Sequence, residues 1–153
     1  MARFTPQEVV HTILQEASRA LKRDKHHAPL LFVFGEYKNA MVRLKFRDPP
    51  SKRASILATG RRLAFLKPYC IAFVAEAWMS KTIPPEGKSV SEMADRQEVL
   101  QAVAQNLEGE IRAAAIPFSR VGKEIVLGEL MESSEVESYL LESFWAGVRQ
   151  RLN

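Results

Sequence analysis

The chain has 153 residues, 46% of them hydrophobic and 8% aromatic, and a formal net charge of +4. This size and composition predict one globular domain, residues 1–153, with a core of ordinary size. No stretch approaches about 18 consecutive apolar residues, the N-terminus lacks the layout of a signal peptide, and the single cysteine, Cys70, excludes an internal disulfide. We therefore expect a cytoplasmic protein with no membrane partner.

Charge is spread unevenly along the chain. Residues 1–70 carry 14 Lys/Arg against 5 Asp/Glu, a net +9, whereas residues 71–153 carry 8 against 13, a net −5. This asymmetry can indicate an acidic partner for the first half. Single domains also mix signs in this way, and the two halves then neutralise each other when they pack. We favour the second interpretation.

The chain opens with a predicted helix and a hairpin. Thr5 and Glu8 can form a capping box, Pro6 suits the first helical position, and apolar residues then recur at helical spacing until about Asp24. Two segments rich in strand formers flank a turn at 35–39. We expect them to pair as a hairpin: Leu30–Phe34 and Ala40–Phe46.

A second helix and a long apolar strand follow. Asp48 or Ser51 caps the helix, which ends before Pro68. The run Tyr69–Met79 is apolar almost throughout, which is typical of a central strand covered on both faces. It leads into a polar loop, 81–95, and loops of this length inside a compact domain are usually functional or mobile.

The second half predicts three more strands and a C-terminal helix. Two glycine-containing turns separate the strands. The strands span three segments: Glu98–Leu107, Ile111–Phe118 and Glu124–Leu130. Ser133 or Ser134 caps the last helix, and its first turn carries Glu135 and Glu137, where the helix dipole favours acids.

The resulting order, α-β-β-α-β-β-β-β-α, indicates an α+β fold with helices packed on a mostly antiparallel or mixed sheet. The order is similar to that of the profilin-like and Roadblock-like sandwiches, which serve mostly as dimerising platforms. Function does not follow from element order alone. The last helix offers a second route to self-association, because Tyr139, Phe144 and Trp145 are large enough to leave an apolar patch for a second copy.

Six residues at the two ends of the long loop form a candidate binding or structural site: Glu76, Trp78, Ser80, Asp95, Arg96 and Glu98. If the loop folds back over the strand exit, its three carboxylates converge and can do acid–base work or hold a divalent cation. Alternatively, Arg96 ties the acids into a salt bridge that anchors the loop base to Glu76 and Trp78. We favour this structural use and assign no catalytic residue.

The strand exit also looks faintly like the JAMM metalloprotease arrangement. Trp78 and Ser80 stand where that zinc site needs histidines, and the spacing from Ser91 to Asp95 is one residue too long. Catalytic zinc needs about three protein ligands, so the missing histidines argue against zinc hydrolysis of this kind. A degenerate, non-catalytic relative stays open as an alternative.

The histidines and the cysteine suggest structural roles. His26 and His27, with Asp24 nearby, fit a solvated helix end better than a transition-metal site, and His11 lies on the polar side of the first helix. Cys70 opens a buried strand, whereas a reactive thiol needs exposure and a positive neighbour. We predict no metal and no cofactor.

Basic residues of the first half can form a patch if the hairpin edge and the second helix share a face. The members of this possible patch are Arg43, Lys45, Arg47, Lys52, Arg53, Arg61 and Arg62. Such a patch can bind phosphate without sequence specificity. No helix-turn-helix, zinc-finger or RNP motif is present, so we favour a solvated basic face over a nucleic-acid site.

The string EAWM at 76–79, a Pro/Gly loop, and DRQEVL at 95–100 together resemble a family of uncharacterised bacterial and phage-associated proteins. In that family a Glu-Ala-Trp strand end is followed by a loop and an Asp-Arg-x-Glu strand start. The resemblance covers residues 69–105 and carries no known activity. It makes the pairing of Glu76 and Trp78 with Asp95, Arg96 and Glu98 worth testing and implies nothing further.

The sequence thus predicts a non-catalytic binding or scaffolding module that self-associates as a homodimer. The identity of any other protein partner is left open. Two alternatives remain. One is a nucleic-acid-associated accessory protein that uses the basic first half. The other is a degenerate or cation-dependent hydrolase-like site around residues 76–98.

Overall fold

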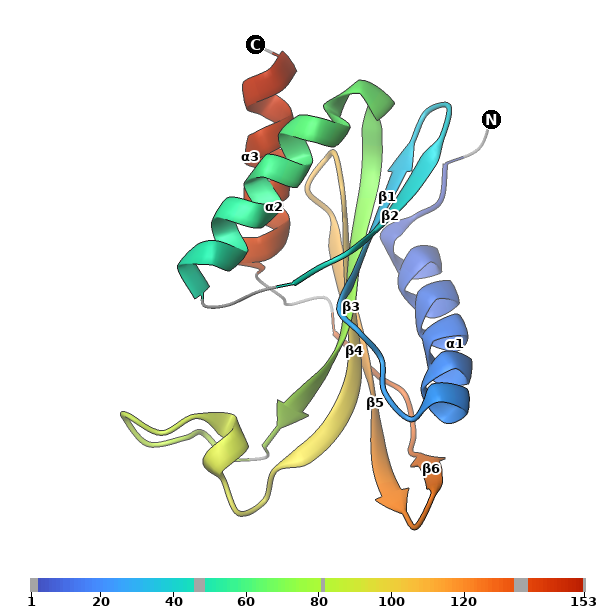
Figure 1. Cartoon of the computed structure of the whole chain (residues 1–153), viewed down its shortest axis with the longest axis vertical. Helices are drawn as coiled ribbons and strands as arrows, with labels where there is room; N and C mark the ends of the chain where they lie inside the picture. The colour runs from blue at the N-terminus through green and yellow to red at the C-terminus, as the bar shows by residue number, and fades with distance from the viewer. Residues whose placement is uncertain (1–2, 46–48, 81, 134–137, 153) are drawn as a thin grey trace.

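A computed structural model describes residues 3–45, 49–80, 82–133 and 138–152. It contains three α-helices and seven strands in an α+β arrangement, as predicted (Figure 1). The elements are α1 Pro6–Asp24, β1 Leu30–Gly35, β2 Asn39–Arg43, α2 Pro49–Leu63, β3 Pro68–Met79, β4 Gln97–Asn106, β5 Ile111–Val121, β6 Glu124–Leu127, β7 Met131–Ser133 and α3 Tyr139–Leu152. Two 3-10 turns, Ala64–Leu66 and Val90–Glu92, lie between them. None of the described helices combines the length and apolar character that crossing a bilayer requires.

The strands form one antiparallel sheet in the order β2-β1-β3-β4-β5-β6, and β7 pairs with β5. Helices cover both faces of this sheet. Helix α1 lies on one face, whereas α2 and α3 lie together on the other (Figure 1). The lower ends of β3, β4 and β5 extend past the α2–α3 layer, and the β3–β4 connection projects sideways from the sheet.

Burial on both faces explains the long apolar run of β3. Successive side chains of a strand point to opposite faces, so Cys70, Ala72 and Val74 pack under α1, whereas Ile71 and Phe73 pack toward α2 and α3. The prediction of a central strand covered on both faces is therefore confirmed.

Helix α1 begins as its sequence predicts. The Thr5 hydroxyl accepts a hydrogen bond from the Glu8 N–H (3.2 Å), and the Glu8 carboxylate accepts one from the Thr5 N–H (3.1 Å). These hydrogen bonds with Thr5 hold the pKa of Glu8 below its usual value. The helix ends at Asp24, because Lys25 adopts a left-handed conformation with φ of 69°.

Two glycines let α2 and α3 approach until their backbones touch. A Cβ at Gly60 would collide with the Phe144 carbonyl oxygen, and a Cβ at Gly147 would collide with the Leu57 carbonyl oxygen. The close approach buries Phe144 and Trp145, which are 0% and 5% exposed. The prediction that these two aromatics leave an apolar patch for a second copy is therefore wrong.

Some boundaries near the C-terminus also differ from prediction. Strand β6 ends at Leu127, three residues early, and a further strand, β7, was missed because all three of its residues are exposed and show no alternation. Ser133 lies in β7 and cannot cap α3. The Ser138 hydroxyl does so, accepting a hydrogen bond from the Leu141 N–H (3.4 Å).

In the first half, Ser51 lies inside α2 instead of capping it, and β2 ends at Arg43. Several predictions fall on residues outside the described ranges: Phe46, Arg47, Asp48, Ser134, Glu135 and Glu137.

We predict that Gly147→Ala destabilises the protein by about 1–3 kcal/mol, because the new methyl group meets backbone of the opposing helix. Alanine has a higher helix propensity than glycine by about 1 kcal/mol. Propensity alone would therefore predict that the substitution stabilises the protein, which is opposite to the effect we expect. Urea denaturation measures the effect. Ala54→Ser, which adds one atom on the exposed side of α2, is the control and should change stability little. A Gly147→Ala protein as stable as the wild type would contradict the close packing.

Candidate functional site

The candidate residues lie where β3 and β4 run past α1. Glu76 and Trp78 share the α1 face of β3, and Trp78 pairs directly with Glu98 of β4. The same alternation along β5 places Ala114, Phe118 and Arg120 on this face. Two acids and an arginine from three neighbouring strands therefore meet below the end of α1.

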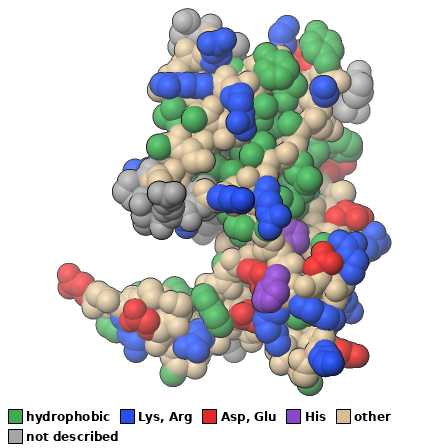
Figure 2. Space-filling model, in the orientation of Figure 1, with side chains coloured by type: hydrophobic (Ala, Val, Ile, Leu, Met, Phe, Trp, Pro, Cys, Tyr) green, Lys and Arg blue, Asp and Glu red, His purple; other side chains and the backbone are tan. Residues whose placement is uncertain are grey.

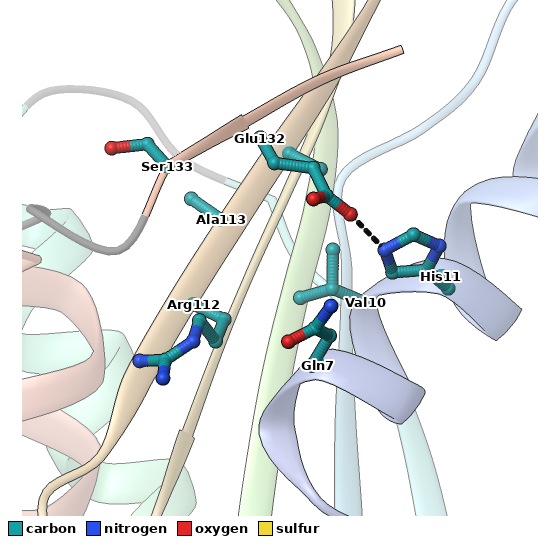
Figure 3. Close-up of a pocket in the computed structure, with 8 residues that line it drawn as sticks. Gln7, Val10, His11, Arg112, Ala113, Glu132 and Ser133 are labelled. Atoms are coloured by element: carbon teal, nitrogen blue, oxygen red, sulfur yellow. Dashed lines mark hydrogen bonds and ion pairs between the residues drawn. The ribbon is translucent and has the colours of Figure 1, made fainter.

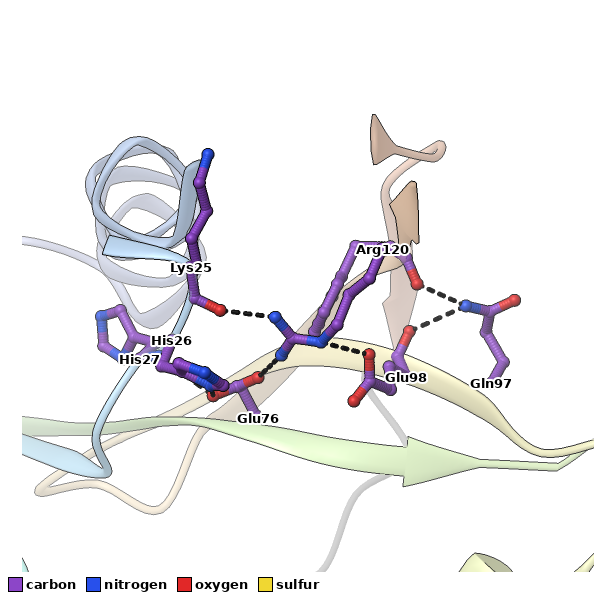
Figure 4. A network of polar contacts seen from close by, with 8 residues as sticks. Lys25, His26, His27, Glu76, Gln97, Glu98 and Arg120 are labelled. Atoms are coloured by element: carbon purple, nitrogen blue, oxygen red, sulfur yellow. Dashed lines mark hydrogen bonds and ion pairs between the residues drawn. The ribbon is translucent and has the colours of Figure 1, made fainter. Parts of the chain in front are cut away.

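Arg120 holds this group together (Figure 4). Its Nη2 donates to Glu76 Oε1 (2.7 Å) and its Nε donates to Glu98 Oε2 (3.0 Å). Its Nη1 donates to the carbonyl oxygen of Lys25 (2.5 Å), the residue that caps the C-terminal end of α1. The positive charge thus satisfies an end carbonyl of α1 and lies at the negative end of the helix dipole. We call this group, Arg120 with Glu76, Glu98 and the Lys25 carbonyl, the Arg120 clasp.

The two histidines after α1 also lie beside Glu76, His27 through its backbone and His26 through its ring. The His27 N–H donates to Glu76 Oε2 (3.0 Å), and His27 is buried. The His26 ring is 78% exposed and its Nδ1 lies 4.0 Å from the same oxygen. Within the described ranges, no three His, Cys, Asp or Glu side chains lie close enough to hold a metal ion.

The clasp engages both acids. Both carboxylates accept a charge-assisted hydrogen bond from the same guanidinium, that of Arg120. A planar guanidinium can donate to several oxygen acceptors at once. A divalent cation between Glu76 and Glu98 would have to displace Arg120. The convergence of these acids therefore favours a structural role over a role in acid–base chemistry.

The arginine that pairs with Glu76 and Glu98 differs from the one predicted from the sequence. We expected Arg96 to neutralise the acids, but Arg120 does so. The cause is the length of β5, which continues to Val121, whereas the predicted strand stopped at Phe118 and left Arg120 beyond its end. With the longer strand, simple alternation from Ala114 would have placed Arg120 beside Glu98.

Arg96, Asp95 and Ser80 instead brace the base of the projecting β3–β4 connection, residues 82–96, which we call the arm. Ser80 Oγ donates to Asp95 Oδ1 (2.6 Å), and the Thr82 hydroxyl donates to Asp95 Oδ2 (2.9 Å). The Arg96 guanidinium lies 5.1 Å from the Trp78 ring centroid. The six candidate residues therefore form two neighbouring sets, the clasp and the arm base.

A second polar group lies between α1 and β7. His11 Nε2 contacts the Glu132 carboxylate beside a pocket of about 290 Å³, which Gln7 and Arg112 also line (Figure 3). Sequence reasoning could not find this contact, because it depends on β7 pairing with β5.

The predicted basic residues separate into two groups. Arg43 is the last residue of the edge strand β2 and Lys45 lies just after it, whereas Arg53, Arg61 and Arg62 are exposed on α2. Lys52 also lies on α2, and Arg47 falls outside the described residues. Arg61 and Arg62 adjoin Arg151 of α3, which was not part of the predicted patch.

The sequence of the chain matches a known protein family. The family described as bacteriophage lambda protein ea47 matches residues 2–147. The chain belongs to this family. The predicted resemblance to a phage-associated family is confirmed, and the two strings that suggested it, 76–79 and 95–100, contribute residues to both the clasp and the arm base. No curated protein and no solved structure matches the chain.

We predict that Arg120→Lys lowers the free energy of unfolding by about 1–2 kcal/mol, because a single ammonium cannot replace three bonds in a fixed fork at this partly exposed site. Arg19→Lys, at an exposed ion pair with Glu16 on α1, is the matched control and should change stability by less than about 0.5 kcal/mol. If the two substitutions lower the free energy of unfolding equally in urea denaturation, the clasp contributes nothing to stability.

Cys70 behaves as a core residue. Burial raises the pKa of its thiol to about 12, so the thiolate fraction at mildly alkaline pH is roughly a thousandfold below that of a free cysteine. We predict negligible labelling by a thiol reagent in the native protein and rapid labelling in urea. Fast labelling of the native protein would contradict the burial.

Proposed function

We propose that the protein is a non-catalytic binding module of the cytoplasm that self-associates through the outer edge of β2. The proposal rests on a contrast between the strand exit and the sheet edge. The acids at the strand exit are engaged in holding the fold, whereas one end of the sheet is an edge strand to which no other described strand is bonded on its outer side. Edge strands readily add a strand of another chain.

The hydrogen bonds of the hairpin show which groups of β2 face outward. The Gly35 N–H donates to the Lys38 carbonyl (3.2 Å), and the Leu44 N–H donates to the Pro29 carbonyl (3.0 Å). Antiparallel pairs alternate between bonded and non-bonded, so Lys38, Ala40, Val42 and Leu44 direct their backbone groups to β1. The backbone groups of 39, 41 and 43 therefore point away from the sheet and suit an added strand.

A two-fold axis through Met41 makes this edge self-complementary. Two antiparallel copies of β2 then place Asn39 of one copy opposite Arg43 of the other, and Ala40 opposite Val42. No like charges stand opposite each other, which would be destabilising in a cross-strand pair. Met41, which is 63% exposed, meets its own counterpart on the axis.

The proposed dimer is weak. Five residues of strand span only about 17 Å, and stable interfaces usually bury about 800 Å² on each partner. We therefore expect association that depends on concentration. The alternative of a cation-dependent hydrolase-like site has no comparable support, because Arg120 already bridges the two acids.

Opposite charges at Met41 test the proposal. Met41→Lys or Met41→Glu places like charges on the axis, so each variant alone should be monomeric by sedimentation velocity at concentrations where the wild type dimerises. Mixing the two variants should restore a dimer, because the charges then attract. Val121→Lys, at an exposed position far along the sheet on β5, is the control and should leave association unchanged.

A wild type that stays monomeric at all concentrations would overturn the proposal, as would a mixture that does not reassociate although each variant unfolds like the wild type.

A further inference from the structure

The C-terminal ends of α2 and α3 meet at one end of the molecule and present arginines around an exposed aromatic ring. Arg61 and Arg62 at the end of α2, Phe65 in the 3-10 turn that follows, and Arg151 of α3 line a pocket of about 410 Å³. No acid lines this pocket in the part of the chain that the structure describes. We call these four residues the basic end.

The packing of the two helices creates this arrangement. They run in the same direction: Arg53 lies over the Tyr139 ring near their start, and Arg61 Nε donates to Gln150 Oε1 (2.6 Å) near their finish. Two helix dipoles therefore place their negative ends together, where cations are favoured. This accounts for arginines at each helix end but not for an aromatic ring left in solvent among them.

The charge of the whole helical layer is one-sided. Residues 49–67 and 138–152 contain seven Lys/Arg and one Asp/Glu. Neither Arg62 nor Arg151 has an ion-pair partner among the described residues. Lys and Arg side chains are visible beside hydrophobic ones at the end of the molecule where α2 and α3 finish (Figure 2). This end carries an excess of positive charge that folding leaves unneutralised.

Aromatic side chains are unusually exposed here. Phe65 is 73% exposed, although it follows the last turn of α2 directly. Tyr37, in the β1–β2 turn, is 80% exposed, with Lys67 Nζ 5.7 Å from its ring centroid. The two segments are joined by a hydrogen bond from the Glu36 N–H to the Leu66 carbonyl (3.2 Å). The rings therefore lie on connected segments with cations beside both.

We propose that the basic end binds single-stranded nucleic acid. The guanidinium groups of Arg62 and Arg151 contact phosphates, and Phe65 stacks on an unpaired base. Cationic grooves with exposed aromatic rings bind single strands in this way, whereas a duplex hides the faces of its bases. Arginine suits phosphate because its planar fork donates two bonds at once.

This inference is independent of the proposed dimer, because none of the four residues belongs to β2. It also differs from the patch suggested by the sequence, since it includes Arg151 from the acidic second half and does not need Arg43 or Lys45.

The test is fluorescence anisotropy of a labelled oligo-dT and of a duplex of equal length, titrated with the full chain over a range of salt. Tighter binding of the single strand is expected, with log K falling linearly against log salt. Arg62→Gln with Arg151→Gln should reduce that slope by about 1.4, or about 0.7 for each phosphate that the protein no longer neutralises. Phe65→Ala should weaken single-strand binding by about tenfold while leaving duplex binding unchanged.

The control removes the same charge elsewhere. Arg19→Gln with Lys22→Gln on α1 should leave single-strand affinity and its salt slope near those of the wild type. Phe65→Trp should retain binding, and its added fluorescence should be quenched by the oligonucleotide.

Three results would overturn the proposal. They are an absence of binding at low salt, an equal loss of affinity in the α1 control, and inorganic polyphosphate binding as tightly as oligo-dT with no effect of Phe65→Ala. The last result would show a general anion site without base recognition.

Discussion

The burial of β3 on both faces is the constraint on which the rest of the structure depends. A strand covered on one side by α1 and on the other by α2 and α3 needs apolar side chains at every position, and residues 69–74 provide them. Its neighbours β1 and β4 then have their registers determined by the same two layers. Two small residues, Gly60 and Gly147, let α2 and α3 pack closely together on their face of the sheet.

Where β3 leaves the shelter of the α2–α3 layer, polar contacts take over from apolar packing. The Arg120 clasp joins β3, β4 and β5 to the end of α1, and contacts at Asp95 and Trp78 hold the arm. A lone carboxylate at such a partly buried position would be costly, but one guanidinium compensates two of them and an end carbonyl of a helix. The same guanidinium thus pairs with both Glu76 and Glu98.

The surfaces that we propose for partners therefore lie elsewhere. Strand β2 ends the sheet with outward backbone groups, and the basic end collects cations from two helices that finish side by side. The ion pairs of Arg120 join it to two acids of its own half of the chain, so they do not neutralise the basic first half. Arg61 and Arg62 of the first half instead adjoin a further cation, Arg151, from the second half.

Local physics determined most of the fold from sequence alone. The Thr5–Glu8 capping box, the apolar run of β3, and the turns at Gly109 and Gly122, whose φ angles are 95° and 62°, depend on neighbours in the chain, so the sequence predicts them. The membership of the candidate site was also predictable in part, because Glu76 and Glu98 lie at recognisable strand ends. Tertiary structure alone decided which cation joins them, because β5 had to extend past its predicted end to bring Arg120 to both acids. It also decided the existence of β7, the burial of Trp145 and the meeting of Arg62 with Arg151. Those outcomes arise from contacts between residues far apart in the chain, and neither local propensity nor periodicity encodes such contacts.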